Sequence, residues 1–119
     1  MDQNIIHQMM ETLGTHAKSL SEDIPKALSS PDLTLPQAER ILSICVQSLS
    51  SIDHLYGSVE QAEENESLDD DLLESASDFA DACYELVISL QNQAFNKVRS
   101  FGGNANKLLN DLQEKHYSD

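Results

Sequence analysis

Residues 67–101 read SLDDDLLESASDFADACYELVISLQNQAFNKVRSF and decide the fold of this chain. Apolar residues recur here mostly at spacings of three and four, which is the period of one buried face of an α-helix. Ser67 offers an N-cap hydroxyl, and Gly102 and Gly103 supply a left-handed stop. The stretch therefore predicts one long helix over 68–101. The residues expected on its buried face are Leu72, Leu73, Ala76, Phe79, Ala80, Cys83, Leu86, Val87, Leu90, Ala94, Val98 and Phe101.

Carboxylates line the outer face of the same predicted helix. Spacings of three, four, three and four residues separate Asp71, Glu74, Asp78, Asp81 and Glu85. At about 1.5 Å per residue these five residues form one ridge about 21 Å long, which we call the acidic ridge. Like charges at such spacings repel each other, by a few tenths of a kcal/mol per pair. The ridge is interpreted either as a solvated face or as a docking surface for a basic partner.

The charge of the 119-residue chain is strongly negative and uneven. The formal net charge is −14, and the interval between Arg40 and Lys97 contains no Lys or Arg. Twelve of the 21 acidic residues fall in that interval, and Glu60, Glu63 and Glu64 extend the field of the ridge from the preceding helix. These three residues and the ridge are the predicted contacts for a protein partner with a basic surface. Non-specific binding to nucleic acid or to anionic membranes is disfavoured.

A second long helix is predicted over 35–64. Thr34 and Gln37 have the spacing of a capping box at its start. The short connection from Glu63 to Ser67 favours an antiparallel hairpin with the helix over 68–101. Facing residue numbers should then sum to about 132, which pairs Tyr56 with Ala76. Gly57 within this helix suggests a close approach by a neighbour or a mild bend.

The remaining segments are predicted to pack along this hairpin. A first helix is expected over 2–21, and residues 22–33, which contain Pro25 and Pro31, are interpreted as a linker. Asn104 can cap a shorter last helix over 105–116.

The predicted fold class is all-α, an antiparallel bundle of three to four helices in one domain over 1–119. Residues 117–119 are expected to form a frayed tail. The sequence leaves open whether the last helix packs on its own chain or on a partner, and whether the protein forms a homodimer.

The sequence predicts no catalytic, cofactor-binding or metal-binding residues, and hence no enzyme. The four His residues are scattered at 7, 16, 54 and 116, and no Glu-x-x-His pair of a di-iron bundle is present. No G-x-S-x-G, P-loop or G-x-G-x-x-G pattern occurs.

Cys45 and Cys83 occupy apolar positions of the two long predicted helices, where a free cysteine behaves as a small hydrophobe. We expect both thiols to be reduced and slow to react. No secretory signal and no apolar stretch of membrane-spanning length are visible, so the expected location is the cytoplasm. A protein exported by a specialised secretion machine without a cleavable signal would look the same.

Residues 54–58, His-Leu-Tyr-Gly-Ser, resemble the phosphorylation segment of histidine phosphotransfer domains. The motif of that family has one more residue between His and Gly, and a Lys before the Gly. Here the spacing is one residue shorter and Tyr56 stands in place of the Lys. The resemblance covers five residues and implies a histidine phosphotransfer-like signalling module.

The sequence is therefore consistent with three functions. The first is a small acidic binding protein that occupies a protein partner stoichiometrically, as an inhibitor, immunity protein, antitoxin or secretion chaperone does. The second is a DNA-mimic inhibitor of a nucleic-acid-binding protein, in which the acidic ridge imitates phosphates. Duplex DNA carries about one charge per 1.7 Å of axis, whereas the ridge carries one per roughly 5 Å of helix. The third is the phosphotransfer-like module.

Overall fold

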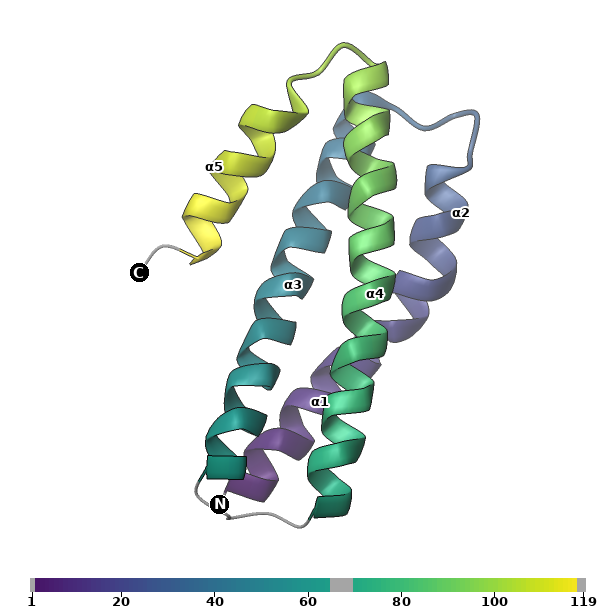
Figure 1. Cartoon of the computed structure of the whole chain (residues 1–119). Coiled ribbons are helices and arrows are strands. Elements are labelled where there is room, and N and C mark those ends of the chain that lie inside the picture. The colour runs from purple at the N-terminus through teal and green to yellow at the C-terminus, as the bar shows by residue number, and fades with distance from the viewer. Residues whose placement is uncertain (1, 65–69, 118–119) are drawn as a thin grey trace.

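The computed structural model describes residues 2–64 and 70–117, with side chains described for 6–64 and 70–115. Every regular element among them is helical, which confirms the predicted all-α bundle built on a long hairpin (Figure 1). The elements are α1 (Asp2–Lys18), the π-helical turn η1 (Ser19–Asp23), α2 (Ile24–Leu28), α3 (Leu35–Glu64), α4 (Asp70–Ser100) and α5 (Ala105–Tyr117).

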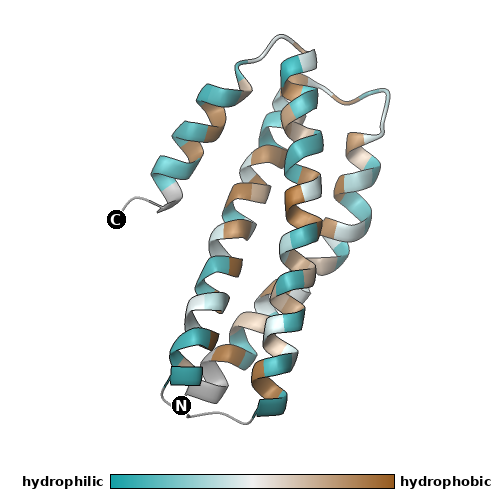
Figure 2. Cartoon of the chain, in the orientation of Figure 1, coloured by the Kyte–Doolittle hydropathy of each residue, from teal (hydrophilic) through white to brown (hydrophobic). Residues whose placement is uncertain are grey.

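The antiparallel pair α3 and α4 forms the centre of the molecule, and α3 has the bounds predicted for it. The buried face of α4 contains several small residues, of which Ala76, Ala80 and Ala94 are completely buried. Small side chains let the two helix axes approach closely, and the larger Leu42, Ile52 and Val87 fill the remaining space. Figure 2 shows the hydrophobic residues of both helices turned towards the interior.

The start of α3 confirms the predicted capping box. The Thr34 backbone N–H donates to Gln37 Oε1 at 2.9 Å, and the Gln37 N–H donates to Thr34 Oγ1 at 3.4 Å. Two N–H groups that have no partner inside the helix are thereby satisfied. The predicted cap at Ser67, by contrast, lies outside the described residues, as does most of the turn that contains it.

The end of α4 confirms the predicted left-handed stop. Gly102 has φ 83°, the Gly103 N–H donates to the Val98 carbonyl, and the Gly102 N–H donates to the Arg99 carbonyl, both at 2.9 Å. This pair of bonds is the Schellman motif. Phe101, predicted on the buried face, is instead 42% exposed. The prediction was wrong there because the helix ends at Ser100, so Phe101 lies in the turn and no longer follows the helical period.

The linker predicted over 22–33 is much shorter in the structure. The helical backbone continues from α1 through η1 and α2 to Leu28, so only residues 29–34 connect it to α3. Pro25 did not stop the helix because the turn before it widens: the Ile24 N–H donates to the Ser19 carbonyl, five residues back. A straight α-helix would place a carbonyl against the proline ring, and the wider π-helical turn relieves that clash.

The last helix, α5, has the predicted start and cap. The Lys107 N–H donates to Asn104 Oδ1 at 3.0 Å, and Ala105 is buried. Tyr117, assigned to the tail over 117–119, is the last helical residue, and the other two tail residues lie outside the described part.

Two further details of the packing differ from prediction. No described residue lies within 4 Å of a Cβ built on Gly57, so the first alternative for this glycine, a close neighbour, is wrong. Five residues of the predicted α4 face are half-buried rather than buried: Leu72, Leu73, Phe79, Cys83 and Leu86.

Candidate functional site

The structure exposes all eight predicted partner-binding residues. Glu60, Glu63 and Glu64 lie in the last turns of α3, and Asp71, Glu74, Asp78, Asp81 and Glu85 lie on the first half of α4. The end of α3 and the start of α4 meet at the same end of the bundle (Figure 1). We call this the acidic end, comprising Asp53–Glu64 of α3 and Asp70–Glu85 of α4.

The eight carboxylates do not share one face. Successive helical residues are rotated by about 100°, so the centre of the acidic ridge points away from the buried Ala76, Ala80 and Val87. The ridge therefore faces solvent on the side of α4 that is remote from α3, and the three glutamates on α3 form a separate group. Only Asp81, at the edge of the ridge, reaches across to α3.

Asp81 accepts a hydrogen bond from the Tyr56 hydroxyl. Tyr56 was paired in sequence with Ala76, five residues earlier on α4. A helical side chain leans towards the N-terminus of its own helix, which in this antiparallel pair is the direction of increasing residue number on α4. The long tyrosine side chain thus meets Asp81. Helical periodicity could not show this contact, because it does not give the direction of a long side chain.

Two more side chains lie near this hydrogen bond. The pKa of Tyr56 is raised to about 12, first by burial, then by the hydrogen bond to Asp81 and its negative charge, with smaller contributions from Tyr84 and Asp53. We call these four residues the tyrosine–aspartate cluster. Tyr84 is 43% exposed, which makes it one of two large exposed hydrophobic side chains in the described chain. The cluster offers an aromatic surface bordered by carboxylates.

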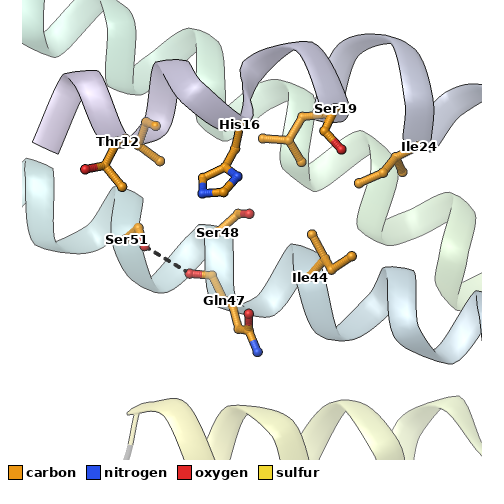
Figure 3. Close-up of a pocket in the computed structure, with 10 residues that line it drawn as sticks. Thr12, His16, Ser19, Ile24, Ile44, Gln47, Ser48 and Ser51 are labelled. Atoms are coloured by element: carbon orange, nitrogen blue, oxygen red, sulfur yellow. Dashed lines mark hydrogen bonds between the residues drawn. The ribbon is translucent and has the colours of Figure 1, made fainter.

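A groove between α1–η1 and α3 was missed by sequence reasoning. Its central cavity has a volume of about 320 Å³, and Figure 3 shows His16 pointing into it from α1, opposite Ser48 and Ser51 of α3. The Ser51 hydroxyl is already bound to the Gln47 carbonyl at 3.3 Å. The available signal was the run of polar residues at 47, 48 and 51 on the side of α3 that faces α1.

The groove continues in both directions. A cavity of about 280 Å³ at one end shares Thr12, Leu13 and Ser51 with the central cavity and adds His54. Another cavity of about 280 Å³ at the other end shares Ile44 and reaches Arg40. The groove brings His16 and His54 to one surface. No group of three or more His, Cys, Asp or Glu suited to hold a metal ion occurs within the described ranges.

The position that a phosphotransfer domain gives to a lysine carries no cation here. Tyr56 holds it, and its hydroxyl is bound to the Asp81 carboxylate. His54 is exposed and lines the end of the groove beside Met9. A phosphate on His54 would therefore gain no positive charge from residue 56.

Both cysteines are free. Cys45 is completely buried, and burial raises the pKa of its thiol to about 12. Cys83 is half-buried, and burial raises its thiol pKa as well. Both environments disfavour the reactive thiolate.

Comparison with known proteins finds no match: no family model, no curated protein and no solved structure resembles this chain significantly. None of the helices in the described part combines the length and the apolar character needed to cross a lipid bilayer.

Proposed function

We propose that this protein is a non-enzymatic binding protein that acts by stoichiometric occupation of a protein partner with a basic surface. The observation that carries the proposal is the acidic end, where exposed carboxylates of α3 and α4 gather in an interval that contains no Lys or Arg. A surface of one sign attracts a partner of the opposite sign and speeds their encounter.

The distribution of the cations supports this proposal. Arg40 lies near the start of α3, and Lys97 and Arg99 lie in the last turn of α4, so all three are at the opposite end of the hairpin. We call that end, with its caps at Thr34, Gly102 and Asn104, the capped end. The negative field of the acidic end is therefore not compensated by the nearest cations along the two helices.

The DNA-mimic alternative gains nothing from the fold. Because the glutamates of α3 lie apart from the acidic ridge, they do not raise its density of about one carboxylate per 5 Å of helix. A basic protein surface, whose charges sit on separate side chains, suits this spacing better than a site built for closely spaced phosphates. The proposed location is the cytoplasm, on the basis of two free, shielded thiols.

The test is affinity capture of partner proteins with wild-type protein and two charge variants. In the ridge variant Glu74→Gln, Asp78→Asn and Glu85→Gln are combined, sparing Asp81 because it accepts from Tyr56. In the control variant Glu11→Gln, Glu22→Gln and Asp23→Asn remove the same charge from exposed positions on α1 and η1.

The expected result is one stoichiometric protein complex, formed by wild type and control. The partner should associate more slowly with the ridge variant than with wild type. Association with wild type should also slow as salt rises, because the Debye length falls from about 10 Å at 0.1 M to about 3 Å at 1 M. Equal association of both variants would contradict the role of the ridge. A captured DNA-binding protein that DNA displaces would favour the mimic instead.

A further inference from the structure

The two sides of the α3–α4 hairpin are covered unequally. On one side the continuous run α1–η1–α2 follows the hairpin along most of its length, and on the other side lies α5 (Figure 1). Figure 3 shows α1 and α5 on opposite sides of α3. At about 1.5 Å per residue, the 13 residues of α5 extend for about 20 Å, whereas the 30 residues of α3 extend for about 45 Å. No helix of the described residues covers the remaining length of this side, roughly 25 Å.

The uncovered part is the part that holds the tyrosine–aspartate cluster. α5 starts beside the first residue of α3, since a Cβ on Gly103 would lie 3.1 Å from Leu35 Cδ1, and it ends about halfway along α3 (Figure 1). Asp53 and Tyr56 lie further along α3. They are also rotated by about 160° and 140° from Ser51, which lines the groove towards α1. They therefore lie on the α5 side of the hairpin, beyond its end.

This uncovered surface has the features of a helix-packing site. On α4, Leu73, Ser77 and Tyr84 follow one another on one side at spacings of four and seven residues. On α3, exposed Gly57 lies one position after Tyr56 with open space over its Cα. Glycine weakens a helix interior, and no contact with another described residue requires it here. A missing side chain would let a second helix approach the backbone of α3 closely.

The chemistry of the surface indicates the charge of its occupant. The carboxylates of Asp53 and Asp81 lie close enough to Tyr56 to raise its pKa, and exposed Glu60 follows Tyr56 by one helical turn on α3. No cation of the hairpin lies nearby in sequence. At the capped end an aromatic ring has a cation beside it: the Arg99 guanidinium lies 5.9 Å from the centre of the Phe95 ring. Cations bind favourably over aromatic faces and beside carboxylates.

We infer that the uncovered side of the hairpin, between the end of α5 and the acidic end, is the docking site for a basic amphipathic helix of a partner protein. The helix has about 16 residues, given the free length of about 25 Å. Its apolar side packs on Tyr84, Leu73 and the open surface at Gly57, and its Lys or Arg side chains reach Asp53, Asp81 and Glu60. The inference rests on the proposed function for the basic character of the partner.

The experiment uses a 16-residue synthetic peptide and the full-length protein. The peptide carries Leu on one helical face and Lys and Arg at its borders, and a scrambled peptide of equal composition lacks that face. Dissociation constants are measured by fluorescence anisotropy with wild type, with Gly57→Leu and with Gly14→Leu. Gly14 is the matched control because it is also an exposed helical glycine with nothing within 4 Å of its Cβ position.

The expected result separates folding from docking. Both glycine variants should raise the melting temperature, because leucine favours a helix more than glycine does. Gly57→Leu alone should weaken binding of the amphipathic peptide, by about tenfold or more, as at other central interface positions. Hydrogen exchange should show protection by the peptide over 53–60 and 77–84.

Three results would overturn the inference. Equal affinity of the two glycine variants would place the peptide elsewhere. Equal binding of the scrambled peptide would reduce the interaction to charge alone, which contradicts the docking site but leaves the proposed function standing. A wild-type dimer in sedimentation equilibrium that Gly57→Leu dissociates would assign the surface to a second copy of this chain.

Discussion

The two ends of the α3–α4 hairpin are built by different means. The capped end is held by specific local bonds: the reciprocal Thr34–Gln37 pair, the Schellman motif at Gly102 and the Asn104 cap. The acidic end carries exposed carboxylates that repel one another, and no helix in the described part of the chain covers one of its sides. The hydrogen bonds at the capped end stabilise the fold. The repulsion between carboxylates at the acidic end destabilises it, and among the described residues only the Tyr56–Asp81 hydrogen bond uses one of those charges. This difference supports the proposal that a partner docks at the acidic end.

The largest expected effect tests whether the two ends share one core. Leu42 near the capped end and Leu55 near the acidic end are both completely buried. Leu42→Ala and Leu55→Ala should each cost about 2–5 kcal/mol of unfolding free energy through lost burial and a residual cavity. Urea melts give both values, with Asp78→Ala as an exposed control that should change stability by less than about 0.5 kcal/mol. A cost below about 1 kcal/mol for Leu55→Ala would show that the acidic end is loosely packed.

Glycine substitutions at the two ends should have opposite signs. A Cβ on Gly103 would lie 2.8 Å from Val98 Cγ1 and 3.0 Å from the Val98 carbonyl oxygen, so Gly103→Ala should cost about 1–3 kcal/mol. A Cβ on Gly57 meets nothing within 4 Å, so Gly57→Ala should stabilise the helix by about 0.5–1 kcal/mol. Thermal melts of the two variants provide the check. A loss of stability in Gly57→Ala would mean that the glycine is needed by the fold itself.

The capped end was also the end that sequence predicted well. Caps depend on residues close together in the chain, so Thr34 with Gln37, Gly102 with Gly103, and Asn104 could be recognised from their spacing. The long helices and the exposure of the carboxylates followed from helical periodicity. The bond from Tyr56 to Asp81 was not predicted, because it joins residues 25 positions apart and depends on the direction of a side chain.

The segment after α1 shows a second limit of sequence reasoning. Proline is a strong sign of a helix end, but a π-helical turn at Ser19–Asp23 accommodates Pro25 and lets the helix continue. The groove with His16 and the uncovered side of the hairpin depend on how the helices pack against one another. The polar residues at 47, 48 and 51 of α3 are the one sign of the groove within a single helix, and the uncovered side has no such sign.

The pH dependence of stability tests the cluster at the acidic end. The pKa of Tyr56 is raised to about 12 in the folded protein, so folding favours the protonated phenol. Its contribution is constant at lower pH and is lost as pH rises from the unfolded value of about 10 towards 12. Urea melts over this range should show the loss. They use a Cys45→Ala background, because the pKa of that thiol is also raised to about 12. Adding Tyr56→Phe should flatten the slope, and an unchanged slope would assign the loss to other groups.

The smallest expected effect concerns repulsion within the acidic ridge. The ridge variant removes every pair of charges at spacings of three and four along the ridge, each costing a few tenths of a kcal/mol. It should therefore gain about 1 kcal/mol or less at low salt, and this gain should disappear at 1 M salt, where the Debye length is about 3 Å. The control variant has the same net charge, but its three carboxylates on α1 and η1 form no such series. Urea melts of both variants across a salt series distinguish local repulsion from the total charge of the protein. If the control variant gained as much unfolding free energy as the ridge variant, the repulsion would come from the net charge of the whole protein and not from the ridge. If only the ridge variant gained, the repulsion would be local, and a basic partner that neutralised the ridge would relieve it on binding.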